Sequence, residues 1–489
     1  MLKAKQDGGI RDRQRKSALL LGLMLLFAIM LSTYVYIAGG GQSHNGDLFV
    51  AGTFVVNGIV GIVFLVRSAQ RHAYSVEIAH WVFYILFFSL APLLQYQSGS
   101  FPWSWYFDDS MIVMGNILVF CWGLLVGLIC NGTKIVNRPS VRLPEISKSL
   151  LLVMLVTSAL ILVYLIATVG FNDLLSRSTN DIEIESSAIR QLIEKTCRAT
   201  VAFTCMAAII NYKNTHTGLI FVLISVIICL IACAPTGMPR YSAAAIWGGI
   251  LIISFGLFNK KIIFPLLFFF ALLVLFPAIN VFKGADYVSA DLLSSLIATL
   301  GSIPTILLEV SYDAYSLLLR TMEYVGYYGV SFGYQLLGSI LFFIPRSLWI
   351  SKPYGSGATV VAAQGQSVTN VACPLPGEGI INFGLAGFFL FAVFVGIAIR
   401  YCDERYWSNS KRSLFVQMFY PQLVFFFFFI MRGDLMSSFA YTVAFGATNY
   451  LWATINRAML ASSAQRTGSR IRIHEENGMV AVGRVHRGA

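Results

Sequence analysis

The stretch SLLLVMLVTSALILVYLIATVG, residues 149–170, carries no charged side chain over its whole length. A membrane-spanning helix needs about 20 mostly apolar residues, because the hydrocarbon core of a bilayer is about 30 Å thick. Lipid offers no hydrogen-bond partner to the backbone, so such a run crosses the membrane only as a helix. The stretch therefore predicts a transmembrane helix, and it sets the pattern to look for elsewhere.

Similar apolar runs recur along the whole chain of 489 residues. Hydrophobic residues make up 57% of it and charged residues 12%, and its mean hydropathy of +0.72 lies outside the range of ordinary soluble domains. We therefore predict an all-α polytopic membrane protein. The twelve predicted transmembrane helices lie at about residues 17–38, 49–66, 78–95, 111–130, 149–170, 197–211, 218–234, 243–258, 262–281, 379–399, 413–431 and 435–455.

The first predicted helix, Ser17 to Ala38, follows a basic head and is long enough to resemble the core of a signal peptide. It is longer than an ordinary signal core, and the glycines at 39–41 are a poor cleavage site. Further apolar runs follow at once. We expect this segment to remain in the protein as a membrane anchor.

The basic residues predict the orientation of the chain, because Lys and Arg in short loops stay in the cytoplasm. With the N-terminus inside, 25 of the 35 Lys and Arg residues fall on the cytoplasmic side. An even number of spans also keeps the basic tail, residues 456–489, on that side. We predict that both termini are cytoplasmic. The net charge of +12 then reflects topology and contact with membrane lipid, and it requires no nucleic-acid partner.

The predicted spans divide the chain into four parts. Residues 1–281 form an N-terminal bundle of nine spans, and residues 282–378 form a long periplasmic loop. Residues 379–455 hold the last three spans, and residues 456–489 form the cytoplasmic tail. The long loop is the largest segment predicted outside the membrane, so we expect the functional residues there and at the neighbouring span ends.

Two parts of the long loop are themselves semi-hydrophobic. Leu292 to Val310 is broken at Pro304, and Ser331 to Ile350 is broken at Pro345. Both are typical of helices that lie on the membrane or dip into it. Alternatively, the second segment is a true span, and a compensating span elsewhere preserves the even count.

Several cations cluster on the predicted periplasmic side, and they are the first candidates for a functional site. Arginines near membrane depth are costly, and they persist where they pair with carboxylates or meet an anionic ligand. Guanidinium groups bind phosphate oxygens bidentately and keep their charge, which suits a pyrophosphate. The candidate pyrophosphate-binding residues are Arg240, Arg320, Arg346, Lys352 and Arg432.

The same side carries carboxylates that could act as a general base. Glu378 lies between glycines at the mouth of the tenth predicted span, where partial burial favours proton transfer. Equally, an acid at this position could simply stabilise the start of a helix. Asp313 is the second candidate. The long loop holds no histidine, and the chain has neither paired metal-ligand spacing nor a nucleotide-binding fingerprint, so we expect no metal and no cofactor.

Four short stretches carry a resemblance to a known family. FFIPRSLWISKP at 342–353 and EGIINFGLAG at 378–387 are similar to sequences of Wzy-type O-antigen and repeat-unit polymerases. PRY at 239–241 and RGD at 432–434 resemble further recurring positions of that family. The likeness in predicted topology extends over nearly the whole chain, whereas the likeness in sequence is confined to these stretches.

One family pattern is an arginine followed by a glycine eleven positions later in a periplasmic loop. Arg346 and Gly357 match it, whereas Arg177, Arg190 and Arg240 in the earlier loops lack the glycine. A second copy of the pattern is therefore not evident. This departure puts a relay between two loops in doubt for this chain.

The resemblance implies an architecture like that of GT-C glycosyltransferases and a multi-pass protein of the bacterial cell inner membrane. It implies a metal-independent polymerase that transfers the growing glycan from undecaprenyl pyrophosphate to the non-reducing end of a new lipid-linked repeat unit. The active site would face the periplasm. The implied partners are the lipid-linked repeat units, a co-polymerase that regulates chain length, and a flippase.

The resemblance also suggests roles for particular residues. Arg240, Arg346 and Arg432 would neutralise the leaving pyrophosphate, with Arg346 counted among the catalytic residues. Glu378, or else Asp313, would accept the proton of the attacking hydroxyl group. The candidate sugar-stacking residues are Tyr241, Tyr312 and Trp349, although aromatic side chains at these positions are also typical of the membrane interface.

Two other functions remain open at this point. A repeat-unit flippase handles the same lipid, but it should show two similar halves with charges deep within the spans. An O-antigen ligase uses the same donor, and in that family a histidine is expected in an outer loop. The late, asymmetric loop and the absence of a histidine from it favour the polymerase.

Overall fold

The computed structural model describes residues 22, 47–132, 143–175, 188–255, 262–277, 306–368, 371–409 and 411–485, with side chains up to Ser463 and at Gln465. All regular elements in these ranges are helical, and no strand occurs among them. Short 3-10 or π turns occur at Leu86–Leu90, Pro102–Ser104, Ala271–Leu275 and Val310–Tyr312. The α-helices are α2 (Leu48–Arg71), α3 (Val76–Ile85), α4 (Ala91–Gln97), α5 (Asp109–Asn131), α6 (Lys148–Val169), α7 (Phe171–Leu175), α8 (Ala188–Thr215), α9 (Leu219–Ala232), α10 (Arg240–Ser254), α11 (Ile263–Phe270), α15 (Ala314–Tyr328), α16 (Tyr334–Ile340), α17 (Ser356–Ala362), α18 (Leu375–Trp407), α19 (Leu414–Arg432) and α20 (Leu435–Val485).

Six helical segments in the described part of the chain are long and apolar enough to cross a membrane. Three shorter apolar helices accompany them, at Leu219–Ala232, Arg240–Ser254 and Ile263–Leu275. The first predicted span, at 17–38, lies outside the described residues apart from Gly22. The long segments are Leu48–Arg71, Val76–Gln97, Asp109–Asn131, Lys148–Val169, Leu375–Trp407 and Leu414–Arg432. The prediction of a helical membrane protein is confirmed in this coarser form.

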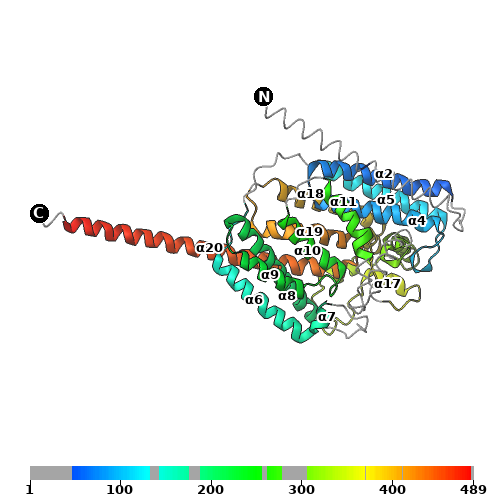
Figure 1. Ribbon diagram of the computed structural model, residues 1–489. Helices are drawn as coiled ribbons and strands as arrows, with labels where there is room; N and C mark the ends of the chain where they lie inside the picture. The colour runs from blue at the N-terminus through cyan, green and yellow to red at the C-terminus, as the bar shows by residue number, and fades with distance from the viewer. Residues whose placement is uncertain are drawn as a thin grey trace, which may run out of the picture.

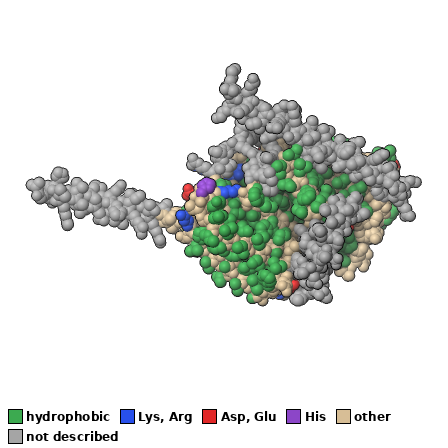
Figure 2. Space-filling view, viewed as in Figure 1, with side chains coloured by type: hydrophobic (Ala, Val, Ile, Leu, Met, Phe, Trp, Pro, Cys, Tyr) green, Lys and Arg blue, Asp and Glu red, His purple; other side chains and the backbone are tan. Residues whose placement is uncertain are grey.

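The outer surface of the bundle is apolar, as lipid contact requires. Leu160 and Val163 of α6 are 66% and 65% exposed, and Leu390 and Phe394 of α18 are 64% and 69% exposed. Figure 2 shows hydrophobic side chains covering most of the described face between the two ends of the bundle. Exposing an apolar surface of this extent to water would be unfavourable, because the free energy falls when apolar groups are removed from water.

Two apolar cores hold the helices together. The first joins residues of α2, α3, α5, α15 and α18, and the second joins residues of α6, α8, α9, α10 and α20. Helix α19 contributes to both, with Val424 in the first core and Phe426 in the second. Figure 1 shows the long helices lying side by side, with α20 extending beyond the others. Helix α19 therefore links the two halves of the bundle.

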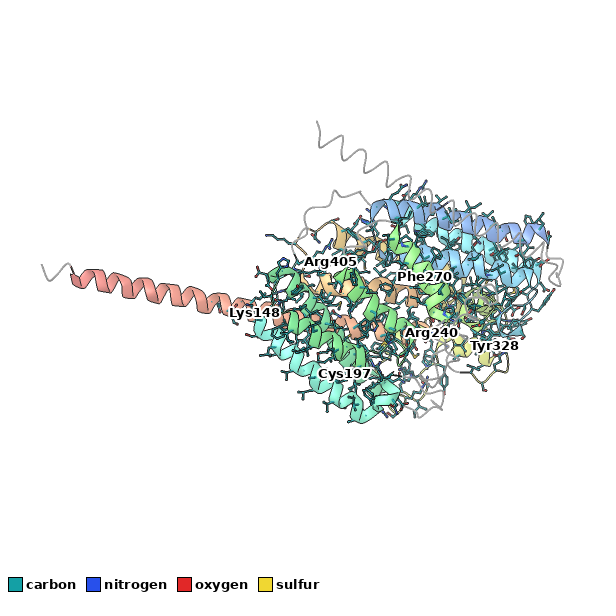
Figure 3. All side chains as sticks on the ribbon, in the orientation of Figure 1. Lys148, Cys197, Arg240, Phe270, Tyr328 and Arg405 are labelled. Carbon is teal, nitrogen blue, oxygen red and sulfur yellow. The ribbon has the colours of Figure 1, made fainter. Side chains whose placement is uncertain are left out.

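The helices alternate in direction, so the connections gather at two ends. The loop end holds segments 98–108, 233–239, 306–368 and 371–374, and the tail end holds segments 72–75, 408–409 and 411–413. In Figure 3, Arg240 and Tyr328 lie toward the loop end, whereas Lys148 and Arg405 lie toward the tail end. Every candidate residue named from the sequence belongs to the loop end.

Local sequence explains two irregular helices. The π turn Leu86–Leu90 comes directly before Pro92, whose ring lacks an N–H and would clash with the preceding turn of a regular helix. Helix α18 is interrupted at Gly384, which has φ +64° and ψ −149°, a conformation that favours glycine.

Helix α16 bears on one alternative for the long loop. It covers only Tyr334–Ile340 of the segment 331–350. Seven helical residues rise about 10 Å, far less than the hydrocarbon core. The structure therefore excludes the alternative in which this segment is a true span. Most of the other semi-hydrophobic segment, 292–310, lies outside the described residues.

Candidate functional site

Two arginines from distant parts of the chain lie near enough to Tyr312, at the loop end, to act on its charge. Arg240 is the first residue of α10, and its guanidinium carbon lies 4.1 Å from the centre of the Phe276 ring. Arg432, the last residue of α19, donates from Nη2 to Asp313 Oδ1 at 3.2 Å. We call Arg240, Tyr312, Asp313 and Arg432 the arginine cluster. It brings together four of the residues that the sequence nominated.

Electrostatics within the arginine cluster are dominated by burial and by the two cations. Tyr312 is buried, and its hydroxyl donates to the carbonyl of Leu272 at 2.7 Å. Burial raises the pKa of Tyr312, and the positive charges of Arg240 and Arg432 oppose this rise. Both arginines therefore act on the same small volume, where positive charge would favour an anion.

Asp313 is held as the partner of Arg432. It is 1% exposed, and its second oxygen, Oδ2, accepts from Trp103 Nε1 at 2.9 Å. Burial raises the pKa of Asp313, while Arg432 and the Trp103 hydrogen bond oppose the rise. Because one oxygen accepts from Arg432 and the other from Trp103, Asp313 is placed to orient the Arg432 guanidinium.

A second group of acidic side chains lies on the other side of the turn after α19. Glu378 is fully buried, and Oε2 accepts from Ser356 Oγ at 2.7 Å while Oε1 accepts from the Leu435 backbone N–H at 3.1 Å. Asp434 lies close enough to influence the charge of Glu378. We call Glu378 and Asp434 the carboxylate pair. Two neighbouring carboxylates disfavour double ionisation, which suits them to hold and release a proton.

Asp434 also begins α20. Its Oδ2 accepts from the Ser437 backbone N–H at 3.3 Å, which is the usual geometry of a helix N-cap. Burial raises the pKa of Asp434 from 3.8 to about 6, and hydrogen bonds from the backbone oppose the rise. A carboxyl group with such a pKa changes charge close to neutral pH.

The turn Arg432–Gly433–Asp434 joins the arginine cluster to the carboxylate pair. Arg432 is directed toward Asp313, whereas Asp434 lies beside Glu378 and Gly355. A Cβ atom at Gly355 would lie 2.4 Å from Asp434 Oδ1, so glycine is needed for this approach. Similarly, a Cβ atom at Gly357 would lie 2.3 Å from the carbonyl oxygen of Ala372.

Three other cations nominated from the sequence are engaged by neighbouring segments of the chain. Lys352 is buried and donates to the carbonyls of Phe342 and Ile344, at 2.8 and 2.9 Å. Arg346 donates to the carbonyls of Lys352 and Pro353, the second at 3.0 Å. These two side chains hold the loop 342–353 in its fold.

Arg320 is likewise committed to local contacts. It pairs with Glu323 one turn further along α15, and it donates to the carbonyl of Tyr106 at 3.2 Å. Its guanidinium carbon lies 4.6 Å from the centre of the Phe107 ring. Arg320 therefore fastens α15 to the aromatic loop between α4 and α5.

The three candidate stacking residues have different surroundings. Tyr241 stacks on Phe429, with ring centroids 3.5 Å apart. Tyr312 is buried and stacks on Phe87 at 5.4 Å, which leaves its ring no open face. Trp349 is half-buried in the loop and donates to Ser351 Oγ at 3.1 Å. The structure does not bring these three rings together.

Sequence reasoning missed several residues that complete the site. Ser356 reaches Glu378, and Trp103 reaches Asp313. Asn382 donates to the carbonyl of Glu378 at 2.8 Å and accepts from the Leu336 N–H at 2.9 Å, which fastens α16 to α18. Asn382 follows Glu378 by one helical turn, and this spacing was the available signal. Nothing local pointed to Ser356 or Trp103.

Within the described ranges, no three His, Cys, Asp or Glu side chains converge in a way that could hold a metal ion. Scans of protein-family models, of curated proteins and of solved structures return no match for this chain.

Proposed function

We propose that the chain is a polysaccharide polymerase that transfers a growing glycan from undecaprenyl pyrophosphate to a new lipid-linked repeat unit. The observation that carries the proposal is the turn Arg432–Gly433–Asp434, which joins a pair of arginines to the carboxylate pair. Such a transfer needs positive charge for the leaving pyrophosphate and a base for the acceptor hydroxyl. The family resemblance of the stretches 342–353 and 378–387 also supports it.

The proposed reaction divides the work between the two groups. The acceptor hydroxyl oxygen attacks the anomeric carbon of the donor, and the bond from that carbon to the pyrophosphate oxygen breaks. The electron pair of the broken bond passes to the pyrophosphate, whose added charge Arg240 and Arg432 stabilise. The hydroxyl proton passes to Glu378, with Asp434 adjusting its basicity. Asp313 positions Arg432.

This proposal assigns scaffold roles to Arg320, Arg346 and Lys352, because carbonyls or a carboxylate of neighbouring segments already engage their donors. Tyr241 and Trp349 remain candidates for contact with a sugar ring. The lipid carrier would reach the site along the apolar flank of the bundle, with its pyrophosphate at the loop end facing the periplasm. A co-polymerase and a flippase would act with the protein in the same inner membrane.

The proposal is tested with purified protein in detergent and a synthetic repeat unit on polyprenyl pyrophosphate. We expect the wild type to form a ladder of products, and R240Q, R432Q and E378Q each to lose it. R400Q serves as the matched control, because Arg400 lies at the tail end in an exposed pair with Glu404. An intact ladder in the three site variants would contradict the proposal.

A test in cells separates the polymerase from its rivals. We expect the site variants to leave a single repeat unit on the surface lipid, because flipping and ligation continue when polymerisation alone fails. Loss of the single unit as well would favour a ligase or a flippase. Equal membrane levels of the variants and of R400Q serve as the control.

A further inference from the structure

Helix α8 carries a buried arginine that the proposed reaction does not use. Arg198 is 6% exposed, and its Nη2 atom lies 2.7 Å from Glu194 Oε1, one turn earlier on the same helix. Its Nε and Nη1 atoms are buried and reach no hydrogen-bond acceptor among the residues that the structure describes. A guanidinium group has five N–H donors, so most of its hydrogen-bonding capacity here is unused.

Leaving these donors unmet is costly. A buried charge without full pairing costs several kcal/mol, and arginines at membrane depth usually face a partner or an anionic ligand. Glu194 does not supply the missing acceptors, because its Oε1 atom approaches Nη2 and not Nε or Nη1. Its side chain is also 38% exposed. The side of the guanidinium that bears Nε and Nη1 therefore requires an acceptor from outside the described protein atoms.

A second cation lies on the same face of α8. Lys195 precedes Arg198 by three residues, a spacing that makes two side chains neighbours on a helix. Its Nζ atom lies 3.6 Å from the centre of the Tyr441 ring. Burial lowers the pKa of Lys195 to about 8, and Glu194 opposes this shift. Two cations thus share one carboxylate, and the group keeps a net positive charge.

This group lies in the second core, where α8 meets α9 and α20. The Arg198 carbonyl accepts from Cys233 Sγ at 3.8 Å, directly after the end of α9. Tyr441 packs edge-on against Tyr241, with ring centroids 4.9 Å apart. The half-exposed Glu194 marks the edge from which a ligand can approach.

We propose that Arg198 and Lys195 form a binding site for a phosphate-type anion, separate from the arginine cluster. Tetrahedral phosphate oxygens match both unfilled donors of the guanidinium, and Lys195 adds a point charge. The ligand is either the headgroup of an anionic phospholipid or a free phosphate or pyrophosphate. This site stands independently of the proposed glycan transfer.

The experiment measures the melting temperature of the full-length protein with two probes. In neutral detergent, inorganic pyrophosphate is titrated into four proteins that all carry R432Q, which disables the arginine cluster. They are R432Q alone and R432Q combined with R198Q, with E194Q or with the control R400Q. In nanodiscs, the same proteins are compared in phosphatidylcholine alone and in equal parts of phosphatidylcholine and phosphatidylglycerol. Arg400 is the matched control because its i,i+4 pair with Glu404 is exposed.

We expect one probe to raise the melting temperature of the control, and R198Q to weaken that binding at least about tenfold, as loss of a charge-assisted pair predicts. E194Q should bind more tightly, because it removes the competing carboxylate. That gain cannot come from misfolding. A response to pyrophosphate identifies a free or substrate phosphate, and a response to phosphatidylglycerol identifies a lipid headgroup. Equal responses of R198Q and R400Q to both probes, or weaker binding by E194Q, would overturn the proposal.

Discussion

Each end of α18 places a buried carboxylate against the start of another helix, but the residues around the two carboxylates differ. At the tail end, Asp403 accepts from the backbone N–H groups of Val76 and Glu77, at 3.0 and 3.2 Å, and from the hydroxyl of Tyr420 at 2.7 Å. At the loop end, Glu378 accepts from the N–H of Leu435 and from the hydroxyl of Ser356. Each carboxylate stabilises the positive N-terminus of a neighbouring helix.

The neighbours of the two carboxylates distinguish structure from chemistry. Asp403 lies against stacked aromatic rings, with the centroids of Tyr406 and Tyr420 3.9 Å apart, and its neighbouring acid, Glu77, is paired with Arg71. Glu378 lies beside Asp434, one residue past the glycine that follows Arg432. Both carboxylates therefore have an acidic neighbour, and the difference lies in the arginines. At the tail end Arg71 pairs with the neighbouring acid, whereas at the loop end Arg432 pairs with Asp313, and this difference is what points to proton transfer at Glu378.

The largest effect should come from E378Q, which keeps the shape of the side chain but removes the base. Transfer should fall about 10²–10⁴-fold, the usual contribution of a general base. The melting temperature should stay near that of the wild type, because an amide oxygen still accepts a hydrogen bond. Initial rates with the synthetic lipid-linked unit measure the effect. E404Q, an exposed acid at the other end of α18, is the control, and near-normal transfer by E378Q would erase the functional contrast between the two ends.

D403A should show the opposite pattern, with lost stability and retained transfer per folded molecule. Removing the carboxylate leaves two N–H groups and the Tyr420 hydroxyl without their acceptor, which costs about 3 kcal/mol or more. Denaturant melts of D403A and E378A make the comparison, since Glu378 accepts two such bonds. A smaller loss in D403A than in E378A would show that the tail end is not the more structural of the two.

G355A should disturb the carboxylate pair without changing a charge. The new methyl group would lie 2.4 Å from Asp434 Oδ1, so the Asp434 carboxyl group must shift. Overpacking of this kind costs about 1–3 kcal/mol, and we expect slower transfer as the pair is displaced. G326A is the matched control, because a Cβ atom there meets nothing within 4 Å. Comparable melting temperatures and rates for the two variants would show that the close approach of Gly355 is unimportant.

The smallest effect concerns pH. The pKa of Asp434 is raised in the folded protein from 3.8 to about 6, so the folded state binds the proton more tightly than the unfolded chain. Its contribution to stability is complete below about pH 4 and is lost as the pH rises through about 6. D434N keeps an N-cap but does not titrate.

The difference between the melting temperatures of D434N and the wild type should therefore shift in favour of D434N, by a few degrees at most, as the pH rises from about 4 to about 7. Groups that do not interact with Asp434 titrate alike in both proteins and cancel in the difference. A constant difference across this range would mean that the loop end does not store a proton at Asp434.

Local chemistry was readable from the sequence, and long-range partners were not. Uncharged runs of about 20 residues predicted the apolar helices, because the bilayer dictates their length and composition. Arg432 and Glu378, both nominated from the sequence, lie at the loop end of the bundle. The pairing of Arg432 with Asp313, 119 residues away, depends on how α15 packs, and no local pattern encodes it.

Lys352 illustrates the limit most clearly. A cation in an outer loop is a reasonable ligand for pyrophosphate, yet its ammonium is enclosed by the carbonyls of Phe342 and Ile344. The same proline-rich loop that made the cation conspicuous also folds around it. Similarly, Trp103 suited an interfacial belt, and only the folded chain shows its N–H bound to Asp313.

In the turn Arg432–Gly433–Asp434, the covalent chain itself limits the distance between the arginine and the acid. Two residues of extended chain separate their Cα atoms by at most about 7 Å, whatever the packing around them. A thinner bilayer can tilt the long helices, yet it cannot stretch this spacing. The distance between the centre of positive charge and the neighbouring acid is thus insulated from the membrane, although both ride on helices that the membrane can move.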